Sequence, residues 1–101
     1  MNITEANQHN SPEDFYASLK EKLEEAHNFP EEYLFKFIIP NSQSKLTEIY
    51  TVFDGLQHTL SNRDSKNGNY VSVSISAFVL DAEQVVKIYK EVSVIEGVMM
   101  L

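Results

Sequence analysis

The chain has 101 residues and a formal charge of −7, with 8 lysines and arginines against 15 aspartates and glutamates. Its length suits one domain, and a hydrophobic content of 43% is typical of a folded chain with a buried core. The negative charge disfavours nucleic acid and membranes as partners, because such a surface repels phosphate groups. Cysteine is absent, which excludes disulfides and thiolate chemistry, and we expect a cytoplasmic protein.

The N-terminal part divides into a tail and a helix. Residues 1–10 are polar and show no periodicity, so we expect them to form a flexible tail. Ser11 can cap free backbone amides and Pro12 suits the first helical position, which predicts an extra N-terminal helix over residues 11–28. Its apolar side chains recur at helical spacing at Phe15, Leu19, Leu23 and Ala26.

A strand, a helix and a second strand are expected next. Residues 33–39 form a dense apolar run between two prolines, which is typical of a central strand that is buried on both faces. Residues 42–54 have a helical pattern, and Gly55 stands where a left-handed cap would end that helix. Residues 56–64 have a mixed composition and predict a weaker strand.

The clearest strand follows a turn at residues 65–69. Residues 70–79 alternate between apolar positions and positions with serine or an aromatic ring, which predicts a strand with its apolar face against helices. Asp81 and Gln84 are spaced as a pair of capping residues at the start of a last helix. The apolar residues 94–101 then predict a final strand.

After the extra helix, the expected order is strand, helix, strand, strand, helix, strand. Short connections and right-handed crossovers favour one arrangement of this order, the ferredoxin-like (βαββαβ) fold of class α+β. It is a four-stranded antiparallel sheet with two helices on one face, and we assign it to residues 29–101. The extra helix would pack on an edge, on an end or on the open face of the sheet.

One segment also carries a family resemblance. The string Ser65-Lys66-Asn67-Gly68-Asn69-Tyr70-Val71-Ser72-Val73-Ser74-Ile75, together with residues 29–30, 35–38 and 95–100, resembles the YbeD-like family of small bacterial proteins of unknown function (DUF493). The resemblance covers residues 29–101 and implies an ACT-like version of the ferredoxin-like fold. ACT-like domains usually serve as ligand-sensing or dimerising regulatory modules, so the resemblance implies a regulatory role by analogy.

The turn before the clearest strand has two interpretations. It is a candidate recognition loop, since Lys66 and Arg63 supply local positive charge and Tyr70 an exposed ring. Alternatively, Asn67 and Gly68 simply supply the positive φ angles of a tight hairpin. The residues concerned are Lys66, Asn67, Gly68, Asn69 and Tyr70.

The polar face of residues 70–79 is the second candidate interaction surface. It carries Ser72, Ser74 and Ser76, whose small side chains would let another sheet or helix approach closely. The alternatives are a solvated face and a face covered by the extra helix. Because Phe78, Leu34 and Ile38 could form an apolar patch there, we expect covering or self-association.

The sequence shows no pattern of a catalytic, metal or cofactor site. Histidines 9, 27 and 58 lack the close spacing of metal ligands, and we interpret the acids at positions 24, 25, 31 and 32 as solvated. A glycine-rich phosphate loop and a nucleophile elbow are absent from the sequence. We therefore expect a protein that is not an enzyme and needs no cofactor.

The resulting hypothesis is a regulatory or protein-interaction module. We expect a homodimer, or binding to an unidentified protein partner or small ligand. The alternative is a metabolite-sensing ACT-like domain that binds its ligand at a dimer interface.

Overall fold

The computed structural model of the chain describes residues 11–101, so the tail predicted for residues 1–10 lies outside the described residues. Within this range the helices are α2 (Pro12–Ala26), α3 (Gln43–Phe53) and α4 (Ala82–Ser93). The strands are β1 (Glu31–Pro40), β2 (His58–Asp64), β3 (Tyr70–Val79) and β4 (Met99–Met100). None of the helices in residues 11–101 has the length and hydrophobicity needed to span a membrane.

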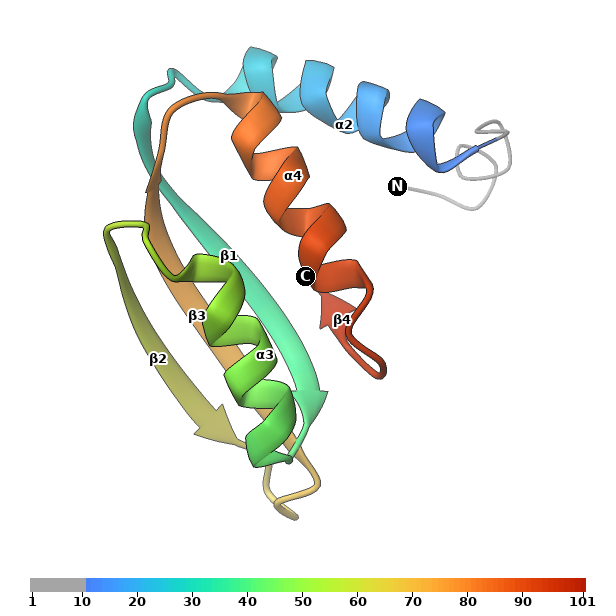
Figure 1. The fold of residues 1–101 in the computed structure, drawn as a ribbon, viewed down its shortest axis with the longest axis vertical. Helices are drawn as coiled ribbons and strands as arrows, with labels where there is room; N and C mark the ends of the chain where they lie inside the picture. Colours follow the sequence, from blue (N-terminus) through green and yellow to red (C-terminus); the bar gives the residue numbers. More distant parts are fainter. Residues whose placement is uncertain (1–10) are drawn as a thin grey trace.

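The strands form one antiparallel sheet in the order β2-β3-β1-β4. Helices α3 and α4 lie together in front of the sheet in Figure 1, each in a connection between strands. This is the βαββαβ order of a ferredoxin-like fold. The predicted fold class is confirmed.

Side-chain caps hold two helix starts, as the sequence indicates. The Ser11 hydroxyl accepts a hydrogen bond from the backbone N–H of Asp14 at 3.2 Å, at the start of α2. At the start of α4, Asp81 accepts from the backbone N–H of Gln84 at 2.8 Å. The Gln84 side chain reaches back and accepts from the N–H of Leu80 at 2.7 Å. These bonds satisfy amides that a helix leaves without partners.

The core lies between the sheet and the helices. Every second residue of β3, from Val71 to Val79, is buried, and so are Phe35, Phe37 and Ile39 of β1. Cross-strand register places these two sets side by side on one face. The rings of Phe35 and Phe53 meet edge to face, with centroids 5.1 Å apart. Strand β1 is therefore central, as predicted, but only one of its faces is buried.

Helix α2 packs against α4, on the helix side of the sheet (Figure 1). Leu23 of α2 is buried in the core, and Leu19 packs against it. The ammonium of Lys90 lies 5.1 Å from the centroid of the Tyr16 ring, a cation–π contact that joins the two helices. The helix therefore extends the helix layer beyond α4. The open-face placement considered from the sequence is wrong.

The final strand is much shorter than the sequence suggests. Only Met99–Met100 pairs with β1, opposite Phe37 and Ile38. The residues before it turn instead, with the N–H of Val98 bonded to the carbonyl of Ile95 at 3.3 Å. Buried Ile95 packs into the core at this turn, so the apolar pattern there reflects burial rather than strand pairing.

Gly97 makes this last turn possible in two ways. Its φ of +86° is a left-handed conformation, and a Cβ built on it would lie 2.9 Å from Cγ of Pro40. We expect Gly97→Ala to lower the free energy of unfolding by about 3 kcal/mol, from backbone strain and overpacking together. Gly68→Ala is the matched control, because Gly68 has a similar φ of +74° but open space around it. It should cost about 1 kcal/mol.

Urea unfolding followed by circular dichroism measures both variants. If Gly97→Ala and Gly68→Ala lower the free energy of unfolding equally, Pro40 does not crowd this turn.

Candidate functional site

The face of the sheet opposite α3 and α4 is not covered by any described residue, and we call it the open face. Alternation along the strands and the cross-strand register place its side chains. They are Glu32, Leu34, Lys36, Ile38 and Pro40 of β1, Thr59, Ser61 and Arg63 of β2, Tyr70, Ser72, Ser74, Ser76 and Phe78 of β3, and Met99 of β4.

Large apolar side chains are exposed on the open face. Leu34 is 53% exposed and Phe78 41% exposed, and they are diagonal neighbours on β1 and β3, since Leu34 lies opposite Ser76 and Phe78 opposite Glu32. Towards the other end of the strands lie Tyr70, Met99 and half-buried Ile38. The apolar patch expected from Leu34, Ile38 and Phe78 therefore belongs to one face, and Ser72, Ser74 and Ser76 lie between its two ends.

A polar hollow of about 380 Å³ lies in the middle of the open face. Its side chains come from three adjacent strands: Lys36 from β1, Ser72 and Ser74 from β3, and Ser61 and Arg63 from β2. Ser61, Ser74 and Lys36 share one row of the sheet, and Arg63 and Ser72 share the next. None of these five side chains has a hydrogen bond or ion pair with another residue in the range 11–101.

The predicted recognition loop is a turn with its own internal hydrogen bonds. The N–H of Gly68 donates to the carbonyl of Ser65 at 3.0 Å, and the N–H of Ser65 donates to Tyr70 at 2.9 Å. Asn67 accepts from the Ser65 hydroxyl at 3.0 Å and from the N–H of Asn69 at 3.2 Å. These bonds account for the turn without a ligand.

One detail of the predicted turn is wrong. Gly68 has the expected positive φ, but no residue other than glycine has one in residues 11–101, so Asn67 does not. The turn spans five residues between β2 and β3, which is longer than the two-residue hairpin that would need both angles. Asn67 therefore acts through its side-chain oxygen instead of its backbone conformation.

The turn is also anchored to the end of β1. The Asn41 side chain donates to the carbonyl of Gly68 at 2.7 Å, and its backbone N–H donates to the carbonyl of Asn69 at 2.9 Å. Lys66 and Tyr70 are exposed. Of the predicted site residues, Tyr70 joins Ser72, Ser74 and Ser76 on the open face, while residues 66–69 form the tip beyond it.

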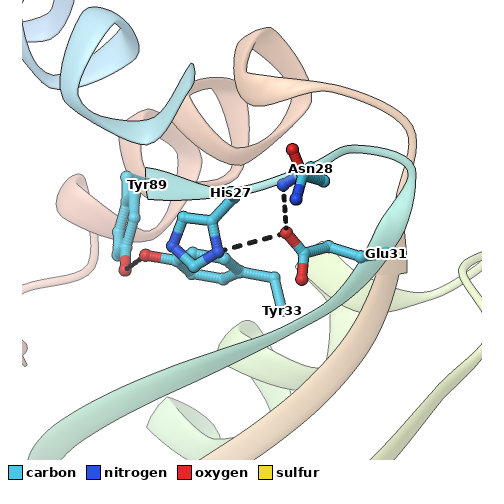
Figure 2. Close-up of polar contacts among 5 residues, drawn as sticks. All are labelled: His27, Asn28, Glu31, Tyr33 and Tyr89. Atoms are coloured by element: carbon cyan, nitrogen blue, oxygen red, sulfur yellow. Dashed lines mark hydrogen bonds and ion pairs between the residues drawn. The ribbon is translucent and has the colours of Figure 1, made fainter. Parts of the chain in front are cut away.

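A second polar cluster lies on the helix side, where α2 joins β1 (Figure 2). His27 Nδ1 lies 3.2 Å from Glu31 Oε1, which also accepts from the backbone N–H of Asn28 at 3.0 Å. The hydroxyls of Tyr33 and Tyr89 are 3.1 Å apart, and the ring of His27 meets that of Tyr33 edge to face. Glu31 is thus a half-buried acid with two hydrogen-bond partners in the chain.

The tyrosine pair in this cluster joins β1 to α4. Burial, and the hydrogen bond with Tyr33, raise the pKa of Tyr89 well above the usual tyrosine range. Its phenol therefore keeps its proton to a higher pH than an ordinary tyrosine does. The contact joins positions 56 residues apart, so no local sequence pattern indicates it.

The other histidines and acids occupy simpler places. His58 is half-buried on edge strand β2 and donates from Nδ1 to the carbonyl of Leu56 at 2.7 Å. Glu24, Glu25 and Glu32 are exposed, and His9 lies outside the described residues. In the described part of the chain, no group of three histidines or acids could hold a metal ion.

These features define a small α+β protein with a ferredoxin-like sheet, an extra helix and one open sheet face. The family model described as "Protein of unknown function (DUF493)" matches residues 24–101, and the chain belongs to this family. The YbeD-like resemblance is thereby confirmed. The match begins in the last turn of α2, slightly earlier than the sequence string suggests.

A relative supports this membership. A "UPF0250 protein" from Shewanella piezotolerans is 31% identical over 83 residues, which cover 79% of this chain and 94% of that protein. No solved structure matches the chain.

The raised pKa of Tyr89 allows the tyrosine pair to be tested through the pH dependence of stability. The unfolded chain releases this proton near pH 10, whereas the folded chain holds it to higher pH, so folding is favoured by the protonated phenol. This contribution is complete below about pH 10 and is lost as the pH rises towards the folded-state pKa. We expect the free energy of unfolding of Tyr89→Phe to fall less steeply than that of wild type between about pH 9 and pH 11.

Urea unfolding across this pH range measures the effect. Tyr70→Phe removes an exposed hydroxyl and should keep the wild-type pH dependence. Identical slopes for Tyr89→Phe and wild type would contradict the buried, hydrogen-bonded phenol.

Proposed function

We propose that this protein is a non-enzymatic, cytoplasmic interaction module that self-associates through its open face. The proposal rests on the exposure of Leu34 and Phe78, which are diagonal neighbours on adjacent strands of an uncovered sheet face. Apolar groups gathered on one exposed face are stabilised when a second surface excludes water from them. The small side chains of Ser72, Ser74 and Ser76, between this end of the face and Tyr70, would let a second backbone approach closely.

The distribution of charge also favours this face for contact between copies. The acids of α2 and α4 lie on the helix side of the sheet, at positions such as Glu21, Glu25 and Glu83. Among the open-face positions of the four strands, Glu32 is the one acid. Two copies with a formal charge of −7 would therefore meet with least repulsion through their open faces.

The size of the face predicts a weak association. The strand lengths and ordinary strand spacing give it a footprint of roughly 450 Å². Two such faces bury roughly 900 Å² together, which is below the range of about 1,200 Å² and above for stable complexes. Reversible pairing of this kind suits a regulatory module.

A non-enzymatic role agrees with the chemistry of the hollow. Ser61, Ser72 and Ser74 have no histidine or carboxylate partner among residues 11–101 that could take a proton from a hydroxyl. A serine nucleophile needs such a base.

The second candidate function is ligand sensing. The polar hollow favours it, because unpartnered cations and hydroxyls gathered in a concave surface are suited to hold a small molecule. If the open faces pair, such a ligand would lie at the dimer interface, as expected of an ACT-like regulatory domain.

Sedimentation equilibrium tests self-association. We expect a concentration-dependent dimer with a Kd between about 10 µM and 1 mM, given the small footprint. The double variant Leu34→Ser and Phe78→Ser should weaken it about tenfold or more, because both changes remove apolar surface from the interface.

Val94→Ser is the matched control. Val94 is 82% exposed but lies at the end of α4, away from the open face. Replacing its apolar side chain should therefore leave the dimer intact. A chain that stays monomeric at about 1 mM would contradict the proposal. So would an equal loss of association in Val94→Ser.

A further inference from the structure

We propose that the polar hollow at the centre of the open face is a binding site for an oxyanion of the phosphate class. Two cations, Lys36 and Arg63, and three hydroxyls, Ser61, Ser72 and Ser74, line it. All five are donors, and a phosphate group is an acceptor through each of its oxygens. The hollow thus has the composition of an anion site within a chain of strongly negative charge.

No acid of the described chain neutralises these two cations. Neither Lys36 nor Arg63 takes part in an ion pair within residues 11–101. The nearest acid on the same face of β1 is Glu32, about 13 Å from Lys36 along the strand. At that distance water and salt screen most of its influence. The positive charge of the hollow is therefore available to an external anion.

The sheet holds the donors in a fixed arrangement. Strand β3 lies between β1 and β2, and Lys36 and Arg63 are one row apart on the open face, so their backbones are about 12 Å apart with two serines between them. Both side chains are long enough to meet over Ser72 and Ser74. The guanidinium can bind two oxygens of one phosphate, and the serine hydroxyls can reach the oxygens that face the sheet.

This arrangement favours phosphate over a carboxylate. Hydroxyls below and cations on two sides surround a tetrahedral group, whereas a flat carboxylate would leave some of the donors unused. The volume of about 380 Å³ also exceeds that of a phosphate ion. It leaves room for the carbon portion of a small phosphate ester.

The site is complete within one chain. All its residues belong to the same sheet, so binding does not require self-association. The inference therefore goes beyond the proposed dimer, and it gives the ligand-sensing alternative a chemical class of ligand.

Amide chemical shifts in a titration with inorganic phosphate test the site on the full chain. We expect saturable shifts at residues 61–63 and 72–74 below about 50 mM phosphate, which corresponds to weak binding. Glycerol 3-phosphate forms the second arm. If glycerol 3-phosphate binds more tightly than inorganic phosphate, the ligand is a phosphate ester. If the two bind equally, the ligand is the free ion. Either result supports the site.

Arg63→Gln and Lys36→Gln should each weaken phosphate binding about tenfold, because each removes a charge-assisted hydrogen bond. Both positions are exposed, so the fold should be retained. Lys87→Gln is the matched control, since it removes an exposed cation from α4 and should leave the affinity unchanged.

Three outcomes would overturn the proposal. They are shifts that do not saturate, an affinity that Lys87→Gln lowers as much as Arg63→Gln does, and binding of a glutamate-rich peptide at these amides without binding of phosphate. Because sedimentation reports the dimer and the phosphate titration reports the site, failure of this site is distinguishable from failure of the dimer. A monomer that binds phosphate would reject only the dimer, and a dimer indifferent to phosphate would reject only the site.

Discussion

The pairing of β1 with β3 is the interaction on which the rest of the structure depends. It runs over ten residue pairs, from Glu31 opposite Val79 to Pro40 opposite Tyr70. Because side chains alternate along paired strands, this one register places Phe35, Phe37 and Ile39 with the valines of β3 on the helix side and the serines of β3 on the other. A slip by one residue would bury the serines and expose the core. The same constraint therefore builds the core and leaves the open face uncovered.

Much of this arrangement could be predicted because its signals are local. Strict alternation predicts β3, and caps at Ser11 and Asp81 predict the starts of two helices. The final strand was overestimated, because residues 94–98 are apolar to fill a turn, and an apolar run alone does not distinguish a buried turn from a strand. The place of α2 also had no local signal, since it depends on contacts with α4, far along the chain.

The candidate site could be predicted only in part. Ser72 and Ser74 follow from the alternation of β3, and both lie in the hollow. The convergence of Lys36 and Arg63 on those serines required the register of strands that are distant in sequence. In sequence, Lys36 merely interrupts an apolar strand. The turn at Gly68 has its own internal bonds, so the surface of interest moves from the hairpin tip to the sheet behind it.

In the single chain, this sheet face is open to solvent and available to a partner. Its exposure can be measured at low protein concentration from the relaxation of side-chain NMR signals by a soluble gadolinium chelate. We expect strong relaxation of Leu34 and Phe78, and little effect on Val73 and Ile75 on the buried face. If Leu34 and Phe78 are protected as well as Val73 is, the face is covered in the single chain and is not available to a partner.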